Sequence, residues 1–277
     1  MPELPEVETI ALALREEGHD TPPVVGRKIQ GVRLLWKRTL ATQPWEKWQS
    51  SLIGQSINHI YRRGKYLILQ LSQNNVLFHL GMSGDLRVEI DSGEPAKHDR
   101  FLLLLEPDLR LVFNDPRKFG RVWLATDPLE VLSTLGPEPL NTSLTPQDFY
   151  RHIHQRKRQL KPLLIDQKFI AGLGNIYTDE ALHAARLHPL TPAHTISQQQ
   201  AEYLLDAIRQ VLSEGIQRHG TSIDWVYQGG EFQNHLRVYQ RTGEPCPTCS
   251  TPIERIIVAQ RGTHYCPSCQ PCPNNPV

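Results

Sequence analysis

Residues 65–80 read KYLILQLSQNNVLFHL, two short apolar runs joined by a polar stretch. Runs of this length, rich in Leu, Ile, Val and Phe and bounded by turn residues, are typical of β-strands. Similar runs follow at residues 100–106, 109–115 and 121–125. Because turn residues interrupt the pattern repeatedly from about Gly26 to Ala125, this region is predicted to form an all-β sandwich or barrel.

A helix is predicted before the β-rich region. Pro5 suits a first helical turn, and apolar residues recur at helical spacing at Val7, Ile10, Ala11 and Leu14. Acidic side chains are favourable near the positive end of a helix, and the opening stretch carries Glu3, Glu6 and Glu8.

The pattern becomes helical after a proline-rich linker at residues 135–145. Thr145, followed by Pro146, is a good N-cap for one helix. Ser197 and Gln200 form a capping-box pattern before a second, periodic apolar run. A β-rich half is therefore predicted to precede a helical half.

Composition restricts the function only weakly. The 277 residues are enough for two domains, and 30 Lys+Arg against 29 Asp+Glu give a formal charge of +1. Nucleic-acid binding would therefore have to come from local basic patches. No apolar run is long enough to cross a bilayer, and the N-terminus lacks a secretory pattern, so we expect a cytosolic protein.

The strongest spacing signal is a pair of Cys-x-x-Cys motifs, Cys246 with Cys249 and Cys266 with Cys269. Two such pairs at this separation predict a structural zinc site with four thiolate ligands. A reactive dithiol is the alternative, and Cys272 could in principle replace Cys266, which would leave Cys266 unexplained. The zinc would hold a hairpin whose tip is expected within QRGTHY, residues 260–265.

A glycine-containing turn follows a basic stretch. Gly172 and Gly174 could open a turn onto a helix beginning near Asn175, where exposed backbone N–H groups would suit a phosphate. The preceding RHIHQRKRQLK contains five cations and no acid, namely Arg151, Arg156, Lys157, Arg158 and Lys161. Such runs are often only solvated faces, but beside a phosphate-type turn this one favours nucleic acid.

Three turns in the β-rich half, RRGKYL, HLGMSG and NDPRKFG, carry large or basic side chains. Met82, Arg117 and Phe119 could enter a base stack as a wedge. Packing of Met82 and Phe119 in the core is the alternative, which the residues alone favour.

Eight motifs in order make the chain resemble formamidopyrimidine-DNA glycosylase along nearly its whole length: PELPEVET, RRGKYL, HLGMSG, KHDR, DPRKFG, LGPEPL, GLGNIY and the four-cysteine finger. The resemblance implies an α+β fold with a catalytic domain, an N-terminal helix plus β-sandwich, at residues 1–135. A helical helix-two-turn-helix DNA-binding domain would follow at 136–236, then a zinc-ribbon β-hairpin at 237–272 and a disordered tail at 273–277.

The implied activity is base-excision repair. Such an enzyme excises oxidised purines, 8-oxoguanine and formamidopyrimidines, from duplex DNA and cleaves the strand by β,δ-elimination. After removal of the initiator methionine, Pro2 would present a secondary amine with a useful neutral fraction. Its attack on the sugar C1′ would displace the base, and the resulting iminium would serve as the electron sink for elimination.

The resemblance also implies site residues. Glu3 would protonate the sugar ring oxygen with a raised pKa, Glu6 would hold the reacting groups, and Lys65 and Arg261 would assist β- and δ-elimination respectively. Expected DNA contacts are Met82, His98, Arg117, Phe119, Arg156, Lys161 and Asn175, and the zinc ligands are Cys246, Cys249, Cys266 and Cys269. The base would be flipped out, since C1′ cannot be reached inside the stack.

Two alternatives stay open at this point. One is an enzyme of the endonuclease VIII type, which acts on oxidised pyrimidines through the same Pro2 and Glu3. The other is a non-catalytic zinc-ribbon DNA-binding protein. In the reading we favour, the partner is damaged double-stranded DNA, zinc is the one cofactor, and the enzyme is a cytoplasmic, nucleoid-associated monomer without a membrane or small-molecule cofactor.

Overall fold

The computed structural model describes residues 1–16, 22–41, 44–222 and 229–273. The chain divides into two compact units, one of residues 1–134 with 219–230 and one of residues 135–218 with 231–277. The tail expected to be disordered lies outside the described residues from position 274 onward. No helix within the described ranges is long and apolar enough to cross a membrane.

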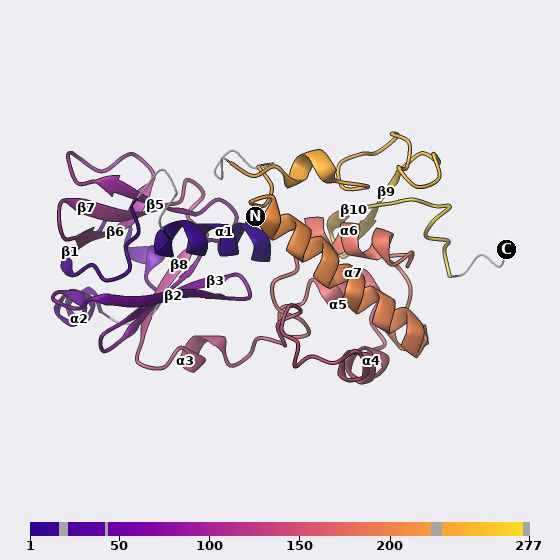
Figure 1. Cartoon of the computed structure of the whole chain (residues 1–277), viewed down its shortest axis with the longest axis horizontal. Helices are drawn as coiled ribbons and strands as arrows, with labels where there is room; N and C mark the ends of the chain where they lie inside the picture. The colour runs from indigo at the N-terminus through magenta and orange to yellow at the C-terminus, as the bar shows by residue number, and fades with distance from the viewer. Residues whose placement is uncertain (17–21, 42–43, 223–228, 274–277) are drawn as a thin grey trace. The chain divides into compact units, whose positions relative to one another are not determined.

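The first unit contains two four-stranded antiparallel sheets (Figure 1). In spatial order, the first sheet consists of β1 (Ile29–Leu34), β6 (Asp99–Leu105), β7 (Leu109–Asn114) and β5 (Asp85–Ile90). The second consists of β2 (Ile57–Arg63), β3 (Tyr66–Leu71), β4 (Asn75–His79) and β8 (Arg121–Ala125). The expected β-sandwich is confirmed.

The sandwich core is built from alternate residues of both sheets. Phe101 pairs with Phe113 across β6 and β7, and Leu67 pairs with Phe78 across β3 and β4. All four are buried in one apolar cluster. Because side chains alternate between the faces of a strand, this register directs every second residue of these strands into the same core.

Helix α1 (Leu4–Arg15) closes the core along β2 and β3 (Figure 1). Its apolar residues Val7, Ile10, Ala11 and Leu14 join the sandwich cluster, as their helical spacing predicts. Two other short helices in this unit, α2 (Trp45–Leu52) and α3 (Leu129–Leu132), were not expected from the sequence. In α2, Trp48 and Leu52, one turn apart, are the buried residues.

The second unit is helical and ends in a hairpin. Its helices are α4 (Pro146–His154), α5 (Leu160–Leu164), α6 (Asn175–Ala184) and α7 (Gln198–Gln217), and its strands are β9 (Glu254–Val258) and β10 (Arg261–Tyr265). Thr145 caps α4 by accepting the Asp148 N–H, and Ser197 and Gln200 form the expected capping box of α7. Helix α6 packs against both α7 and β10, which places it between the helices and the hairpin (Figure 1).

Candidate functional site

The chain start is held by one carboxylate. Glu6 accepts the backbone N–H of Glu3 at 2.8 Å and, with its other oxygen, the backbone N–H of Thr221 at 2.8 Å. Glu3 and Glu6 are each only 2 % exposed, while Pro2 is half-buried. Gly220 has a φ of +75°, and a Cβ there would lie 2.8 Å from the Glu6 side chain, so only glycine fits beside this carboxylate. The residues around Pro2 are therefore fixed in position.

Lys65 lies in the turn between β2 and β3 and is almost fully buried. Nearby, burial and the positive charge of Lys65 lower the pKa of His79 to about 4. His79 is therefore neutral at physiological pH, and its Nδ1 accepts the backbone N–H of Gly81 at 3.2 Å. This contact fixes the start of the turn that carries Met82.

The expected wedge residues lie on the surface. Met82 is 40 % exposed and Phe119 is 53 % exposed, so the core-packing alternative for both is wrong. The Arg117 guanidinium lies 5.3 Å from the centroid of the Phe119 ring. Exposed apolar side chains paired with a cation are able to enter a base stack and to contact phosphate.

Asp115 joins the two turns that carry these side chains. Its carboxylate accepts the Ser83 hydroxyl at 2.6 Å and the backbone N–H of Gly120 at 2.7 Å. It also accepts the N–H of Arg117 at 3.2 Å. Because Asp115 is 1 % exposed, these bonds are shielded from water, and the turns are held as one rigid surface.

The KHDR segment attaches to the same aspartate through its backbone. The carbonyl of His98 accepts the Asp115 N–H at 2.9 Å, and Arg100 Nε donates to the Asp115 carbonyl at 2.8 Å. Arg100 is buried, whereas His98 is half-buried. Of these two side chains, only His98 is available to DNA.

In the second unit, Gly172 has a φ of +97° and α6 begins at Asn175, as the glycine pattern predicts. The Asn175 amide donates to the carbonyl of Gly262 at 2.9 Å, next to the exposed Arg261. The start of α6 and the first residues of β10 therefore lie side by side. Arg261 begins β10, and the hairpin turn is formed by Ala259 and Gln260, so the tip is shorter than expected.

The position of Lys161 in the structure corrects its expected role as a DNA contact. Its side chain is fully buried, where it forms an ion pair with Asp179 and donates to the Asn175 carbonyl at 3.0 Å. An ammonium in this position cannot reach a phosphate outside the fold. Asp179 also accepts the backbone N–H of His264 at 3.0 Å, so the pair connects α5 and α6 to the finger strand.

The remaining cations of the basic stretch divide into two groups. Arg151 pairs with Asp148, and Arg158 pairs with Asp166 at 2.7 Å. Arg156 and Lys157 are exposed just after α4. The surface charge available for DNA is therefore smaller than the sequence run suggests.

Cys246, Cys249, Cys266 and Cys269 bring their sulfur atoms within 4.8 Å of one another. The sulfur separations are 3.9 Å for Cys246–Cys269 and 3.4 Å for Cys249–Cys266, against about 3.8 Å for tetrahedral sites with Zn–S bonds of about 2.3 Å. The cluster fits one structural zinc, and Cys272 is not part of it.

One further carboxylate and a histidine tie the finger to α6. Glu180 is buried and accepts the backbone N–H groups of Arg237, Val238 and Tyr239 at 2.8, 3.0 and 2.8 Å. Burial raises the pKa of Glu180 despite these bonds. His183 Nε2 lies 3.4 Å from the Cys246 sulfur.

Sequence reasoning did not single out Asp115, Asp179, Glu180 or Thr221. Asp115 lies inside the DPRKFG motif, and Asp179 and Glu180 follow shortly after GLGNIY, so acids among basic or apolar residues could have been noticed there. Thr221 has no comparable local signal, because its partner Glu6 is 215 residues away.

Three family models match the chain. Those described as the formamidopyrimidine-DNA glycosylase N-terminal domain, the formamidopyrimidine-DNA glycosylase H2TH domain and the zinc finger found in FPG and IleRS match residues 1–122, 135–226 and 243–271. Similar curated proteins include the formamidopyrimidine-DNA glycosylases of Protochlamydia amoebophila, 43 % identical over 98 % of this chain and 99 % of that protein, and Chloroflexus aurantiacus, 44 % identical over 98 % of each.

Solved structures are similar too. The Lactococcus lactis formamidopyrimidine-DNA glycosylase bound non-covalently to DNA containing an AP site is 35 % identical, with a TM-score of 0.90 over 98 % of this chain and 100 % of that one. A complex of the same enzyme with DNA containing N7-benzyl-Fapy-dG is 36 % identical, with the same TM-score and coverage.

Proposed function

This chain belongs to the formamidopyrimidine-DNA glycosylase family, and we propose that it excises oxidised purines through its N-terminal Pro2 and then cleaves the strand. As a family member it is a zinc-finger DNA glycosylase and AP lyase of base-excision repair. The observation that supports the assignment to Pro2 is the Glu6 carboxylate, which holds both the backbone of Glu3, the residue after Pro2, and the backbone of Thr221.

The chemistry starts from the chain end. Once Met1 is removed, the Pro2 nitrogen is a secondary amine that attacks C1′ and displaces the damaged base. Glu3, buried beside it, protonates the opening sugar. The iminium acidifies the C2′ hydrogens, and elimination of the 3′ and then the 5′ phosphate follows.

The other proposed roles follow from position. Lys65 assists β-elimination, and Arg261 neutralises charge at the 5′ phosphate during δ-elimination. Asn175 and Arg156 bind backbone phosphates, as does His98. In this scheme Lys161 does not bind phosphate but has a positioning role, because its ammonium is buried.

Met82, Arg117 and Phe119 fill the space left by the flipped nucleotide. Their exposure and their attachment to Asp115 support this proposal. From the family resemblance, residues 220–233 are expected to cover the flipped base. Of these, residues 223–228 lie outside the described residues.

We further infer that the enzyme acts as a monomer on damaged duplex DNA in the cytoplasm, at the nucleoid. Residues 1–135 would form the catalytic domain, 136–236 the helix-two-turn-helix domain and 237–272 the finger. The finger and the helices share a compact unit, and residues 219–230 contribute to the N-terminal one.

Borohydride trapping tests the proposal. Zinc-loaded protein lacking Met1 is incubated with duplexes containing 8-oxoguanine or an oxidised pyrimidine, reduced, and digested to locate the adduct. We expect a covalent complex through Pro2 with the purine lesion. The matched control is protein that retains Met1, where Pro2 is an internal residue without a basic amine.

The possible results separate the alternatives. Trapping only with the pyrimidine would place the enzyme in the endonuclease VIII branch. In Pro2→Gly, cleavage of the purine lesion should collapse while DNA binding persists. Unchanged cleavage by this variant, or no adduct with either lesion, would contradict the role of Pro2.

A further inference from the structure

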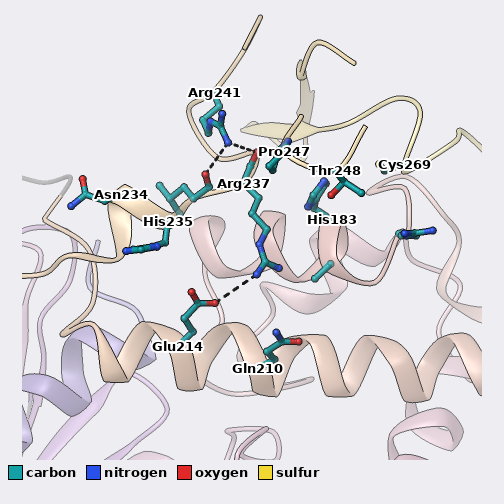
Figure 2. A pocket seen from close by; sticks show the side chains of 13 residues that line it. His183, Gln210, Glu214, Asn234, His235, Arg237, Arg241, Pro247, Thr248 and Cys269 are labelled. Atoms are coloured by element: carbon teal, nitrogen blue, oxygen red, sulfur yellow. Dashed lines mark hydrogen bonds and ion pairs between the residues drawn. The ribbon is translucent and has the colours of Figure 1, made fainter. Parts of the chain in front are cut away.

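A pocket of about 600 Å³ lies in the second unit between the end of α6, the middle of α7, the segment before the finger and the zinc knuckles (Figure 2). Its lining is rich in hydrogen-bond donors, among them Asn234 and Thr248. The volume lies within the range of roughly 300–1,000 Å³ found for small-molecule sites. None of the proposed catalytic or DNA-contacting residues lines it.

Positive charge predominates in this pocket. Three arginines, Arg186, Arg237 and Arg241, line the pocket together with a single carboxylate, Glu214. Figure 2 shows Arg237 pointing toward Glu214, whereas Arg241 lies on the opposite side of the pocket. Glu214 is shared between Arg237 at 3.8 Å and Arg218 at 3.4 Å, both long contacts. One carboxylate therefore compensates the cluster only in part.

The three guanidinium groups differ in how many of their N–H donors are already bonded within the protein and how many are left for a ligand. Arg241 is occupied by Glu244 at 2.8 Å and by the carbonyls of Leu236 and Arg237, so its role is structural. Within the described ranges, the one ion pair of Arg237 is its long contact with Glu214 at 3.8 Å. Arg186 is exposed just after α6 and has no ion pair within the part of the chain that the structure describes.

We propose that this pocket binds a small phosphorylated ligand of about mononucleotide size, with Arg186 and Arg237 of its lining as the cations that hold the ligand. The planar guanidinium can donate two parallel hydrogen bonds to a phosphate. The volume exceeds that of one phosphate, and the neutral donors in the lining are suited to an attached sugar or base.

The pocket is distinct from the phosphate turn at the start of α6. Asn175 is the first residue of that helix, and the pocket begins at His183, near its last residue. Eight residues at about 1.5 Å each separate them by roughly 12 Å along the helix axis. A phosphate bound at Asn175 is therefore not the one bound at Arg186.

Binding would also affect the finger. Cys269 and Thr248, which follows Cys246 by two positions, line the pocket, and Arg237 is the first residue of the finger segment 237–272. A ligand held by both Arg186 and Arg237 would tie the end of α6 to the start of the finger segment. We therefore expect the occupied pocket to slow the loss of zinc.

The test uses the zinc-loaded full chain with 2′-deoxyadenosine 5′-monophosphate and, separately, inorganic phosphate as probes, followed by calorimetry and phosphorus NMR. We expect millimolar or tighter binding of the nucleotide, weakened at least about tenfold in R186Q/R237Q, which corresponds to about 1.4 kcal/mol. The charge-matched control R151Q/K168Q, changed at two exposed cations outside the pocket, should bind as the parent does.

Zinc content and circular dichroism show whether each variant is folded. Transfer of zinc to a chromogenic chelator should slow when the nucleotide is added to the parent and not when it is added to R186Q/R237Q. Absence of binding at millimolar concentrations, or equal binding by parent and R186Q/R237Q, would overturn the proposal.

A competition experiment with duplex DNA tests whether the phosphate bound in the pocket belongs to a free ligand or to the DNA backbone. Saturation with a duplex carrying an uncleavable abasic analogue should leave nucleotide binding unchanged. Displacement of the nucleotide by this duplex, together with a shallower salt dependence of duplex binding in R186Q/R237Q, would assign the pocket to DNA and overturn the small-ligand proposal.

Discussion

The ammonium of Lys161 and the carboxylate of Asp179 form an ion pair from which solvent is fully excluded. One oxygen of Asp179 accepts a hydrogen bond from the Lys161 ammonium, and the other accepts the backbone N–H of His264 on the finger strand. The finger strand and the buried lysine of α5 are therefore held by a single side chain.

Asp179→Asn should destabilise the second unit strongly. Removing one partner of a buried ion pair leaves an uncompensated charge and costs about 3–5 kcal/mol. The double change K161M/D179N removes both charges and should recover most of that loss. Urea unfolding of the zinc-loaded chain, followed by circular dichroism, measures both, and an unchanged midpoint in Asp179→Asn would refute this account of the pair.

Asp115→Ala should impair base extrusion more than DNA binding. The change deletes the acceptor that joins the turns of Met82 and Phe119, and a displacement of about 1 Å can cost on the order of 100-fold in rate. Single-turnover excision from a lesion duplex should fall steeply. Affinity for a duplex with an abasic analogue, which has no base to extrude, should change little, and an equal loss in both assays would contradict the wedge role.

Because the pKa of His79 is lowered in the folded chain, the free energy of unfolding should decrease in mild acid. Its pKa is about 4 in the folded chain, chiefly because of burial, against about 6.5 when unfolded. Between these values the unfolded chain binds more protons, so stability falls as pH decreases from about 6.5 to about 4.

In His79→Asn, a side-chain oxygen can still accept the Gly81 N–H but does not titrate, so this part of the acid loss should disappear. Tryptophan fluorescence reports on the first unit, which contains Trp36, Trp45, Trp48 and Trp123. Urea midpoints of parent and variant across this pH range make the comparison, and parallel curves would show that His79 is not responsible.

Cys249→Ser should release the zinc, while Cys272→Ser should not. Cys249 belongs to the four-sulfur cluster and Cys272 lies outside it. Because a structural zinc provides folding energy, the finger should unfold and DNA affinity should fall, while the β-sandwich remains folded. Metal content by atomic absorption and proteolysis of the finger test this, and a zinc-free Cys272→Ser protein would mean that the ligand set is wrong.

Local patterns predicted much of the fold. Strand runs, the Thr145 and Ser197 caps and the paired cysteines each depend on residues close in sequence, and all are present. Strands β1, β2 and β5 were not identified individually, because polar or charged residues interrupt their apolar residues and leave no continuous apolar run.

Contacts between distant residues could not be predicted. Glu6 meets Thr221 across 215 positions, and Asp179 meets His264 across 85. A lysine in a basic run is expected to be exposed, and only the tertiary position of Asp179 makes burial of Lys161 favourable. The exposure of Met82 and Phe119 likewise depends on how Asp115 holds two turns together.

The contact between Glu6 and Thr221 also sets an order of events during synthesis. The reacting end leaves the ribosome first, but one of the groups that hold its carboxylate is residue 221 of 277. The sandwich can begin to fold as soon as its own strands emerge, whereas the N-terminal centre stays incomplete until most of the chain has been translated. Under the proposed role of Pro2, a truncated nascent chain would carry the N-terminal amine without the Thr221 contact that holds Glu6.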